Sequence, residues 1–195
     1  MNESMRTTRT LILIGLRGSG KSTVGRLAAD RLQGTFVDLD DVTPGILGRG
    51  TVAEAWRLDG QAAFRTAEAA ALRRVIEDPP DVLALGGGTP TAPGAADLLT
   101  QARGSGSVGV VYLRAGAREL RRRLESAGSG AESGPGSNRP SLTGRPPLDE
   151  IEDVLAARDP IYLSLADVVI ESSGLTVSAC ADAVVEAARP GGNFP

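Results

Sequence analysis

The segment TLILIGLRGSGKST, residues 10–23, decides the fold of this chain. An apolar run typical of a strand buried on both faces leads into a glycine-rich loop and then into a helical segment. Gly15 to Ser22 match the pattern G-x-x-x-x-G-K-[ST], in which backbone N–H groups and the helix N-terminus bind phosphate. Lys21 can reach the outer phosphates, and Ser22 can ligate Mg²⁺. We therefore predict a phosphate-binding loop (P-loop) that binds ATP or GTP.

Strand-like and helix-like segments alternate along the rest of the chain. Apolar runs that end in polar residues or glycine lie at residues 35–40, 81–88, 107–114 and 166–172. Helical patterns cover Val24 to Leu32, with Gly34 as the stop, and residues 61–77, 117–126, 149–159 and 177–189. This alternation predicts one α/β domain with a mostly parallel sheet, which binds ligands beyond the carboxyl ends of its strands. The first eight residues and the closing PGGNFP are expected to fray, which leaves a core at about 10–188.

Composition excludes several classes of protein. The net charge of −3 gives no electrostatic case for nucleic acid, and the chain has no histidine, which removes Ser-His-Asp and Cys-His mechanisms. No apolar stretch approaches the ~20 residues of a membrane span. The start of the chain has no signal-peptide core, and Cys180 is the only cysteine. We therefore expect a cytoplasmic protein that binds neither nucleic acid nor membrane.

Polar residues and glycines mark the ends of two predicted strands. Asp38 and Asp40 stand two apart in FVDLD, so on a strand both would project to the same side beside the P-loop. One could hold Mg²⁺ through water while the other contacts the acceptor hydroxyl, because phosphoryl transfer needs a carboxylate to orient the nucleophile. Helix capping is the alternative, and it would suit Asp41 better. Three glycines at 86–88 exceed what a turn needs, so this backbone is expected to lie against a substrate.

Two arginines suggest the charge of the acceptor. Arg65 and Arg158 fall in helical segments with apolar surroundings, and a pair of guanidinium groups would suit an anionic acceptor. The absence of an N-K-x-D segment near a late strand argues against a GTPase, and the small size argues against a motor or transporter ATPase. A small-molecule kinase is the prediction. The alternatives are a kinase for another hydroxy acid such as gluconate, a sensing domain without catalysis, and a structural α/β domain.

Taken together, these motifs resemble those of the shikimate kinase family. The matching segments stand in family order over roughly residues 10–172: GLRGSGKSTVGRLAA, FVDLD, TVAEAW…DGQAAFRTAE, LALGGG, VVYLRA, NRPSLTG and RDPIY…AD. The resemblance implies a nucleoside-monophosphate-kinase-like three-layer sandwich around a five-stranded parallel sheet in the order 2-3-1-4-5. It implies ATP- and Mg²⁺-dependent phosphorylation of the 3-hydroxyl of shikimate, a step toward chorismate and the aromatic amino acids. We expect the enzyme to act as a monomer.

The resemblance also assigns roles to residues on the nucleotide side. Gly18, Ser19, Gly20, Lys21, Ser22 and Thr23 would hold the ATP phosphates. Ser22 would bind Mg²⁺, with Asp38 in the outer shell of the metal. Arg139 would come in over the phosphates, and Arg123 would pack near the adenine.

On the acceptor side, the resemblance implies that Asp40 binds the shikimate hydroxyls and is the candidate base. Arg65 and Arg158 would hold shikimate mainly through its carboxylate, together with the backbone of Gly86, Gly87 and Gly88. The acceptor-binding region would span about 40–75. The catalytic set would then be Lys21, Asp40 and Arg139.

Two segments depart from the family pattern. Pro44 and Gly45 follow Asp40 closely, and both disfavour a helix interior, so we expect a shifted or broken helix there and an altered wall of the acceptor site. Residues 126–138 form a Gly/Ser-rich insert with the composition of a flexible linker. We interpret residues 126–147 as a mobile lid that delivers Arg139 to the phosphates.

Overall fold

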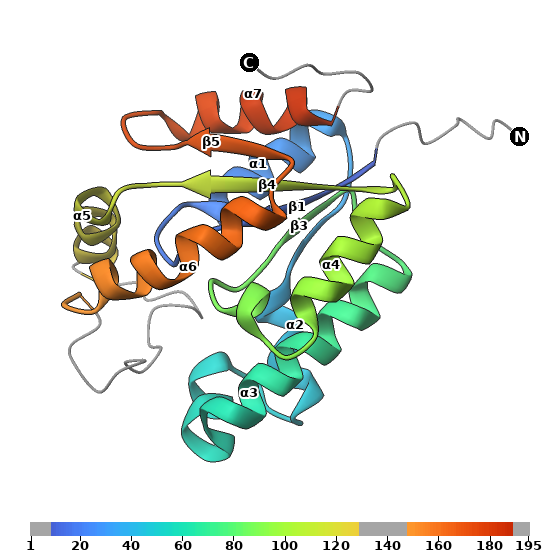
Figure 1. Cartoon of the computed structure of the whole chain (residues 1–195), viewed down its shortest axis with the longest axis vertical. Helices are drawn as coiled ribbons and strands as arrows, with labels where there is room; N and C mark the ends of the chain where they lie inside the picture. Colours follow the sequence, from blue (N-terminus) through green and yellow to red (C-terminus); the bar gives the residue numbers. More distant parts are fainter. Residues whose placement is uncertain (1–8, 129–147, 189–195) are drawn as a thin grey trace, which may run out of the picture.

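The computed structural model describes residues 9–128 and 148–188. Five parallel strands form one sheet in the order β2-β3-β1-β4-β5 (Figure 1). They are β1 (Thr10–Ile14), β2 (Phe36–Asp38), β3 (Val82–Ala84), β4 (Val108–Arg114) and β5 (Val168–Glu171). The predicted fold class and strand order are confirmed.

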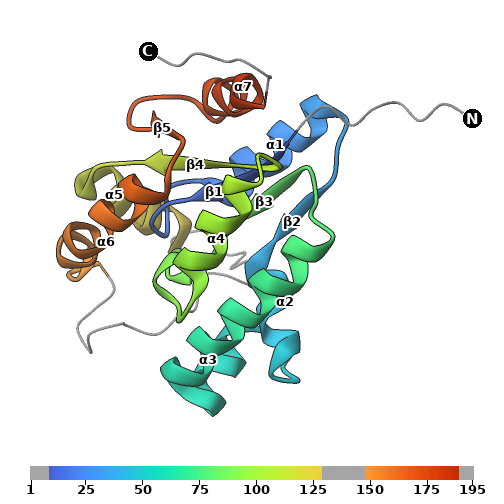
Figure 2. The same cartoon turned by 45° about the vertical axis from the view of Figure 1, so that its right-hand side comes forward.

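Helices cover both faces of this sheet and complete a three-layer sandwich (Figures 1 and 2). Those in the described residues are α1 (Lys21–Leu32), α2 (Leu39–Ile46), α3 (Val52–Glu77), α4 (Ala95–Gly104), α5 (Ala117–Gly128), α6 (Ile151–Leu165) and α7 (Val177–Ala187), with a 3₁₀ turn, η1 (Thr89–Thr91). α1 and α7 pack on one face, and α3, α4 and α6 pack on the other. None of the helices in these ranges has the length and apolarity that a membrane crossing requires.

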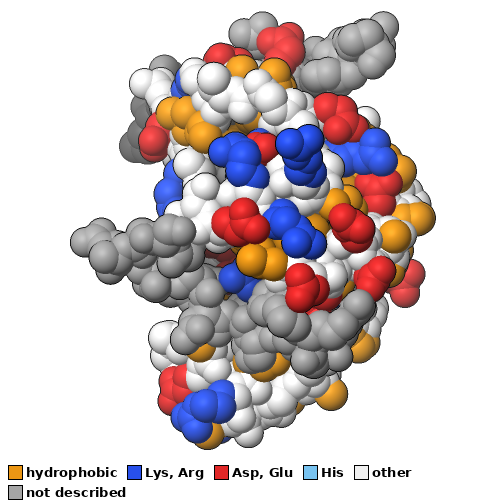
Figure 3. Space-filling model, turned by 90° about the vertical axis from the view of Figure 1, so that its left-hand side faces the viewer, with side chains coloured by type: hydrophobic (Ala, Val, Ile, Leu, Met, Phe, Trp, Pro, Cys, Tyr) orange, Lys and Arg blue, Asp and Glu red, His pale blue; other side chains and the backbone are white. Residues whose placement is uncertain are grey.

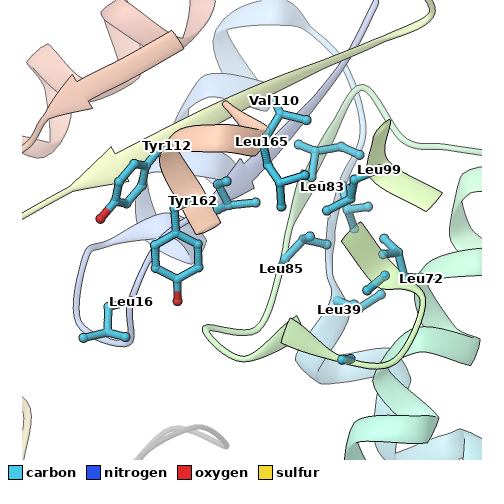
Figure 4. Packing of buried hydrophobic residues seen from close by; sticks show 14 of the residues in the cluster. Leu16, Leu39, Leu72, Leu83, Leu85, Leu99, Val110, Tyr112, Tyr162 and Leu165 are labelled. Atoms are coloured by element: carbon cyan, nitrogen blue, oxygen red, sulfur yellow. The ribbon is translucent and has the colours of Figure 1, made fainter. Parts of the chain in front are cut away.

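The inner strands of the sheet are mostly apolar because both of their faces are buried, whereas the edge strand β5 alternates between buried and exposed positions. In β1, Ile12 and Ile14 pack into the cluster beneath α4 and α6, whereas Leu11 and Leu13 pack beneath α1 and α7. All four side chains are 0% exposed. Period-two alternation therefore divides one apolar run between two cores. Figure 4 shows part of the first core, in which two tyrosine rings lie together at one side and leucines from the sheet and helices fill the other.

The segment between β2 and β3 projects beyond the sheet. α2 and α3 extend together past the β2 edge (Figure 2). α3 bends at Gly60, whose φ of 78° and ψ of 172° are not helical, so the helix predicted from residue 61 is the second half of a longer one. The first half contributes Trp56 to a small apolar cluster with Phe64. This half, and α4, were missed from the sequence.

The ends of two helices were predicted only in part. α1 ends at Leu32, as expected, but the residue that caps it in the left-handed conformation is Gln33 (φ 53°) and not Gly34. Of the shifted or broken helix expected at Pro44 and Gly45, the break was wrong, because α2 runs through both residues to Ile46. Pro44 removes one backbone donor, but the helix ends two residues later, and the Pro44 carbonyl closes its end by accepting from Leu47 N at 3.0 Å. The proline therefore removes one hydrogen bond close to the end of the helix.

α1 approaches the sheet so closely that only glycine fits at position 25. A Cβ on Gly25 would lie 2.6 Å from Phe36 Cε2 and 3.1 Å from Leu13 Cδ1. Gly25→Val should therefore lower the free energy of unfolding by about 1–3 kcal/mol, because an overpacked core must shift its backbone or its rotamers. Urea denaturation followed by circular dichroism measures the loss.

The matched control for this prediction is Gly104→Val at the end of α4. Nothing lies within 4 Å of a Cβ at Gly104, so the same replacement meets no neighbour there. Equal destabilisation by both variants would show that the close approach of α1 to the sheet is not the cause.

Candidate active site

The P-loop connects β1 to α1 and is held from within by its own lysine. Lys21 Nζ donates hydrogen bonds to the carbonyls of Gly15 (2.9 Å) and Leu16 (3.0 Å). The Lys21 residue is only 8% exposed. Gly20, at the N-cap of α1, has a left-handed φ of 96° that suits a residue without a Cβ. These contacts curl the loop around the start of the helix, as phosphate binding requires.

Arg123 on α5 braces the same loop from outside. Its Nη1 donates to the Ser19 carbonyl at 3.0 Å, and its Nη2 donates to the Ser172 carbonyl at 2.7 Å. Its Nε donates to Glu119 at 2.7 Å. Hydrogen bonds from Arg122 and Arg123 lower the pKa of Glu119 to about 2, so this carboxylate is ionised at neutral pH. The predicted place of Arg123 near adenine stays a prediction, and its described contacts tie the P-loop to the end of β5.

The two aspartates of FVDLD do not share a strand. β2 ends at Asp38, which is the N-cap of α2 and accepts from Asp40 N at 3.0 Å. Asp40 therefore lies in the first turn of the helix, and the prediction that both project from one side of a strand was wrong. The capping role falls to Asp38 and not to Asp41. Asp38 also accepts a hydrogen bond from Ser22 Oγ at 2.5 Å, which joins α2 to the start of α1.

A cleft of 620 Å³ opens over the P-loop. Its lining comes from the P-loop and α1, the start of α2, the end of β3, α5 and the start of α7: Arg17 to Val24, Asp40, Leu85, Gly87, Glu119, Arg122 to Leu124, Leu175 to Val177, and Cys180. The face toward which β4 and β5 point shows Lys and Arg side chains interspersed with Asp and Glu (Figure 3). The cleft thus joins the phosphate-binding backbone to Asp40.

The three glycines after β3 pass between the P-loop and side chains of α2 and α3. A Cβ on Gly86 would lie 2.7 Å from both Asp40 Oδ1 and Glu68 Oε1, and a Cβ on Gly88 would overlap the guanidinium of Arg65. The backbone therefore lies against site side chains, and side chains larger than hydrogen would displace them. The sequence predicted that this backbone lies against a substrate. The neighbours that the structure describes are side chains and backbone of the protein itself.

Glu68 is a site residue that sequence reasoning missed. It is 0% exposed, and its two carboxylate oxygens accept hydrogen bonds from Arg65 Nη1 and from Thr89 Oγ1 (2.9 Å for the latter). The Arg65 guanidinium also lies 5.3 Å from the centre of the Trp56 ring. Its orientation is thus determined by an ion pair and an aromatic face. The available signal was the acid three residues after Arg65, a spacing that brings side chains together on a helix.

Arg158 reaches the same turn from α6. Its Nη1 donates to the Gly87 carbonyl at 3.0 Å. The structure therefore brings together the P-loop, Asp38, Asp40, Arg65, the three glycines and Arg158, as the sequence predicted. Arg139 and most of the expected lid, from residue 129 to residue 147, lie outside the described residues, as do the termini expected to fray.

The donor atoms beside the P-loop suit a magnesium ion. The Ser22 hydroxyl and the Asp38 carboxylate are adjacent oxygen donors at the start of α1, and Mg²⁺ prefers such donors with phosphate and water as further ligands. Within residues 9–128 and 148–188, no group of three or more His, Cys, Asp or Glu side chains could hold a metal alone. Ser22 and Asp38 alone supply two oxygen donors beside the P-loop.

Fold and site define a P-loop kinase with a nucleoside-monophosphate-kinase-like core. The chain belongs to the shikimate kinase family, because the family model described as Shikimate kinase matches residues 17–189. The chain is 39% identical over 166 residues to Shikimate kinase 2 of Yersinia enterocolitica, a match that covers 85% of this chain and 88% of that relative.

Solved structures agree with this assignment. A shikimate kinase from Acinetobacter baumannii in complex with shikimate matches with a TM-score of 0.78 and 28% identity, over 94% of each chain. A gluconokinase from Sinorhizobium meliloti matches with a TM-score of 0.51 and 15% identity, over 93% of this chain and 92% of that one. The second likeness is one of fold alone.

The buried contact between Thr89 and Glu68 yields a test. Thr89→Val keeps the shape of the side chain but removes the donor to Glu68, so the free energy of unfolding should fall by about 1–3 kcal/mol. Thr43→Val is the control, because Thr43 is equally buried but donates only to the Leu39 carbonyl within α2. Urea denaturation compares the two variants. A loss at Thr89 no larger than the loss at Thr43 would contradict the importance of the contact.

Proposed function

We propose that this protein transfers the γ-phosphoryl group of ATP to the 3-hydroxyl of shikimate, giving shikimate 3-phosphate and ADP. The observation that carries the proposal is the turn at residues 86–88, which lies against Asp40 and Arg65 and accepts from Arg158 while lining the P-loop cleft. A nucleotide site and two guanidinium groups suited to a carboxylate therefore share one backbone turn.

The nucleotide side follows from the geometry of the P-loop. Backbone N–H groups from Gly18 to Thr23 would bind the phosphates, and Lys21 would exchange its carbonyl partners for phosphate oxygens. Ser22 and Asp38 would hold Mg²⁺, which neutralises developing phosphate charge when it is bound. Arg139 is proposed to reach the phosphates from the lid and Arg123 to border the base.

Asp40 would act on the acceptor. Its carboxylate would orient the 3-hydroxyl and take its proton while the hydroxyl oxygen attacks the γ-phosphorus and the bond to ADP breaks. Arg65 and Arg158 would bind the carboxylate of shikimate and so fix which hydroxyl faces ATP. Glu68 would keep Arg65 oriented without touching the acceptor. Catalysis here is mainly positioning and charge neutralisation.

Several broader features are proposed with this function. The chain would be a single kinase domain with an acceptor-binding region at about 40–75 and a lid at about 126–147, and it would act as a monomer in the cytoplasm. A gluconate kinase is the second candidate, but a fold likeness at 15% identity is its only support.

The activity is tested by ADP release from purified protein supplied with MgATP and shikimate. Release should depend on shikimate, and gluconate in its place should give only background. ADP release with gluconate and none with shikimate would refute the proposal. Omission of Mg²⁺ with a chelator present should abolish turnover, since Ser22 and Asp38 would then have no cation to hold.

Asp40→Asn should lower kcat by about 10²-fold or more, because the amide cannot take the proton. Affinity for ATP should stay near that of the wild type. Asp41→Asn is the matched control, since this carboxylate is 60% exposed and faces Arg26. Steady-state kinetics and ATP binding by calorimetry measure both effects. A kcat for Asp40→Asn equal to that of the control would remove Asp40 from its role.

A further inference from the structure

We propose that Tyr162 is a positioning residue for acceptor binding. Its hydroxyl fixes the Gly87 peptide and so allows Arg158 to turn from that peptide to the carboxylate of the acceptor. The inference rests on the proposed function, because it concerns the same acceptor site. The segment RDPIY supplies both residues, but sequence reasoning gave a role only to Arg158.

One backbone carbonyl receives both side chains. The Gly87 oxygen accepts from Tyr162 Oη at 2.5 Å and from Arg158 Nη1 at 3.0 Å. A carbonyl oxygen has two lone pairs, so the two donors can be accommodated together. Arg158 and Tyr162 stand four residues apart on α6, which places them one above the other on the same face of the helix.

The two donors differ in their freedom. Tyr162 is 0% exposed, and its ring packs 5.0 Å from that of Tyr112. Figure 4 shows its hydroxyl directed toward the loop that follows β3, away from the Tyr112 hydroxyl. Burial raises the pKa of Tyr162 to about 12, so the hydroxyl remains a donor at any assay pH near neutrality. Arg158 is only partly buried and has five donors on a long side chain.

Because Tyr162 is fixed and Arg158 can move, the two residues have separate roles. When Arg158 turns to a carboxylate, the Gly87 carbonyl keeps the hydrogen bond from Tyr162. Without the Tyr162 hydroxyl, the same turn would leave a carbonyl in a buried site without its side-chain donors, which carries a desolvation cost. Acceptor binding would then have to offset that cost, and its affinity would fall.

The effect should not extend to ATP. A Cβ on Gly87 would lie 3.0 Å from Arg17 N, so the Gly87 backbone does touch the P-loop. However, the loop is held independently, by Lys21 from within and by Arg123 from α5. Loss of one hydroxyl on α6 leaves both braces in place.

The test is steady-state kinetics of Tyr162→Phe with shikimate and ATP varied in turn. The KM for shikimate should rise about 5- to 20-fold, the effect of one lost hydrogen bond to a buried acceptor. The KM for ATP and kcat should change by less than about threefold, because the P-loop braces are intact. Calorimetric binding of shikimate gives the same comparison without turnover.

Tyr112→Phe is the matched control. Tyr112 belongs to the same ring pair, but its hydroxyl donates to Asp159 (2.7 Å), which also accepts two hydrogen bonds from Arg114 at 2.8 Å. The KM for shikimate of this variant should stay within about twofold of the wild type, as for substitutions away from a site. Equal increases in both tyrosine variants would show that the ring pair acts through packing and would overturn the inference.

Other outcomes also decide the matter. An unchanged KM for shikimate in Tyr162→Phe, or equal increases in both KM values, would refute the positioning role. An unfolded Tyr162→Phe protein by circular dichroism at the assay temperature would assign the hydroxyl to stability and refute it as well. If the wild-type protein neither binds nor phosphorylates shikimate, the proposed function itself is refuted. If the wild type is active and Tyr162→Phe has the same KM for shikimate, only this inference is refuted.

Discussion

The backbone of residues 86–88 lies closer to its neighbours than a chain with side chains could. Asp40 and Glu68 stand against Gly86, and the Arg65 guanidinium stands against Gly88. The carbonyl between them receives Arg158 and Tyr162. One short turn therefore contacts side chains from α2, α3 and α6 and, through Gly87, the backbone of the P-loop. Because this turn follows β3, beside β1 in the sheet, the strand order itself places the turn, and with it the proposed acceptor region, next to the phosphate-binding loop.

Several charged side chains in and beside this site are paired locally. Arg65 is paired with the buried Glu68, Arg123 with Glu119, and Asp159 with Arg114, whose hydrogen bonds lower the pKa of the Asp159 carboxyl. Asp38 performs two tasks at once, as the cap of α2 and the acceptor of the Ser22 hydroxyl. A residue that caps a helix can thus also be proposed as a ligand of Mg²⁺. Sequence reasoning treated these as alternatives, and the structure shows that capping and the contact with the P-loop coexist.

The features that the sequence predicted well are those that depend on residues close together in the chain. The P-loop pattern spans eight residues, and the five apolar runs each became a strand, with β1 and β3 buried along their whole length. Asp40 was placed on the wrong element because three residues of β2 are too few to show where the strand stops. Pro44 was judged by propensity alone, without the knowledge that α2 ends within two residues. Tyr162 was missed because its partner Gly87 lies 75 positions away, and the contact of Glu68 with Thr89, 21 positions away, was equally invisible, although its spacing from Arg65 was a signal.

The brace formed by Arg123 has a consequence for how the protein is made. The P-loop emerges from the ribosome early, but Ser19 is joined to Arg123 across 104 positions, and Arg123 is held in turn by Ser172 just after β5. Contacts of such separation form only after the intervening chain is available, and they slow folding because loop closure must come first. A nascent chain that ends before β5 therefore carries the phosphate-binding motif, its internal Lys21 contacts and Arg123, but not the Ser172 carbonyl that holds Arg123 in place. The outer brace of the P-loop is complete only when the chain beyond β5 has been made.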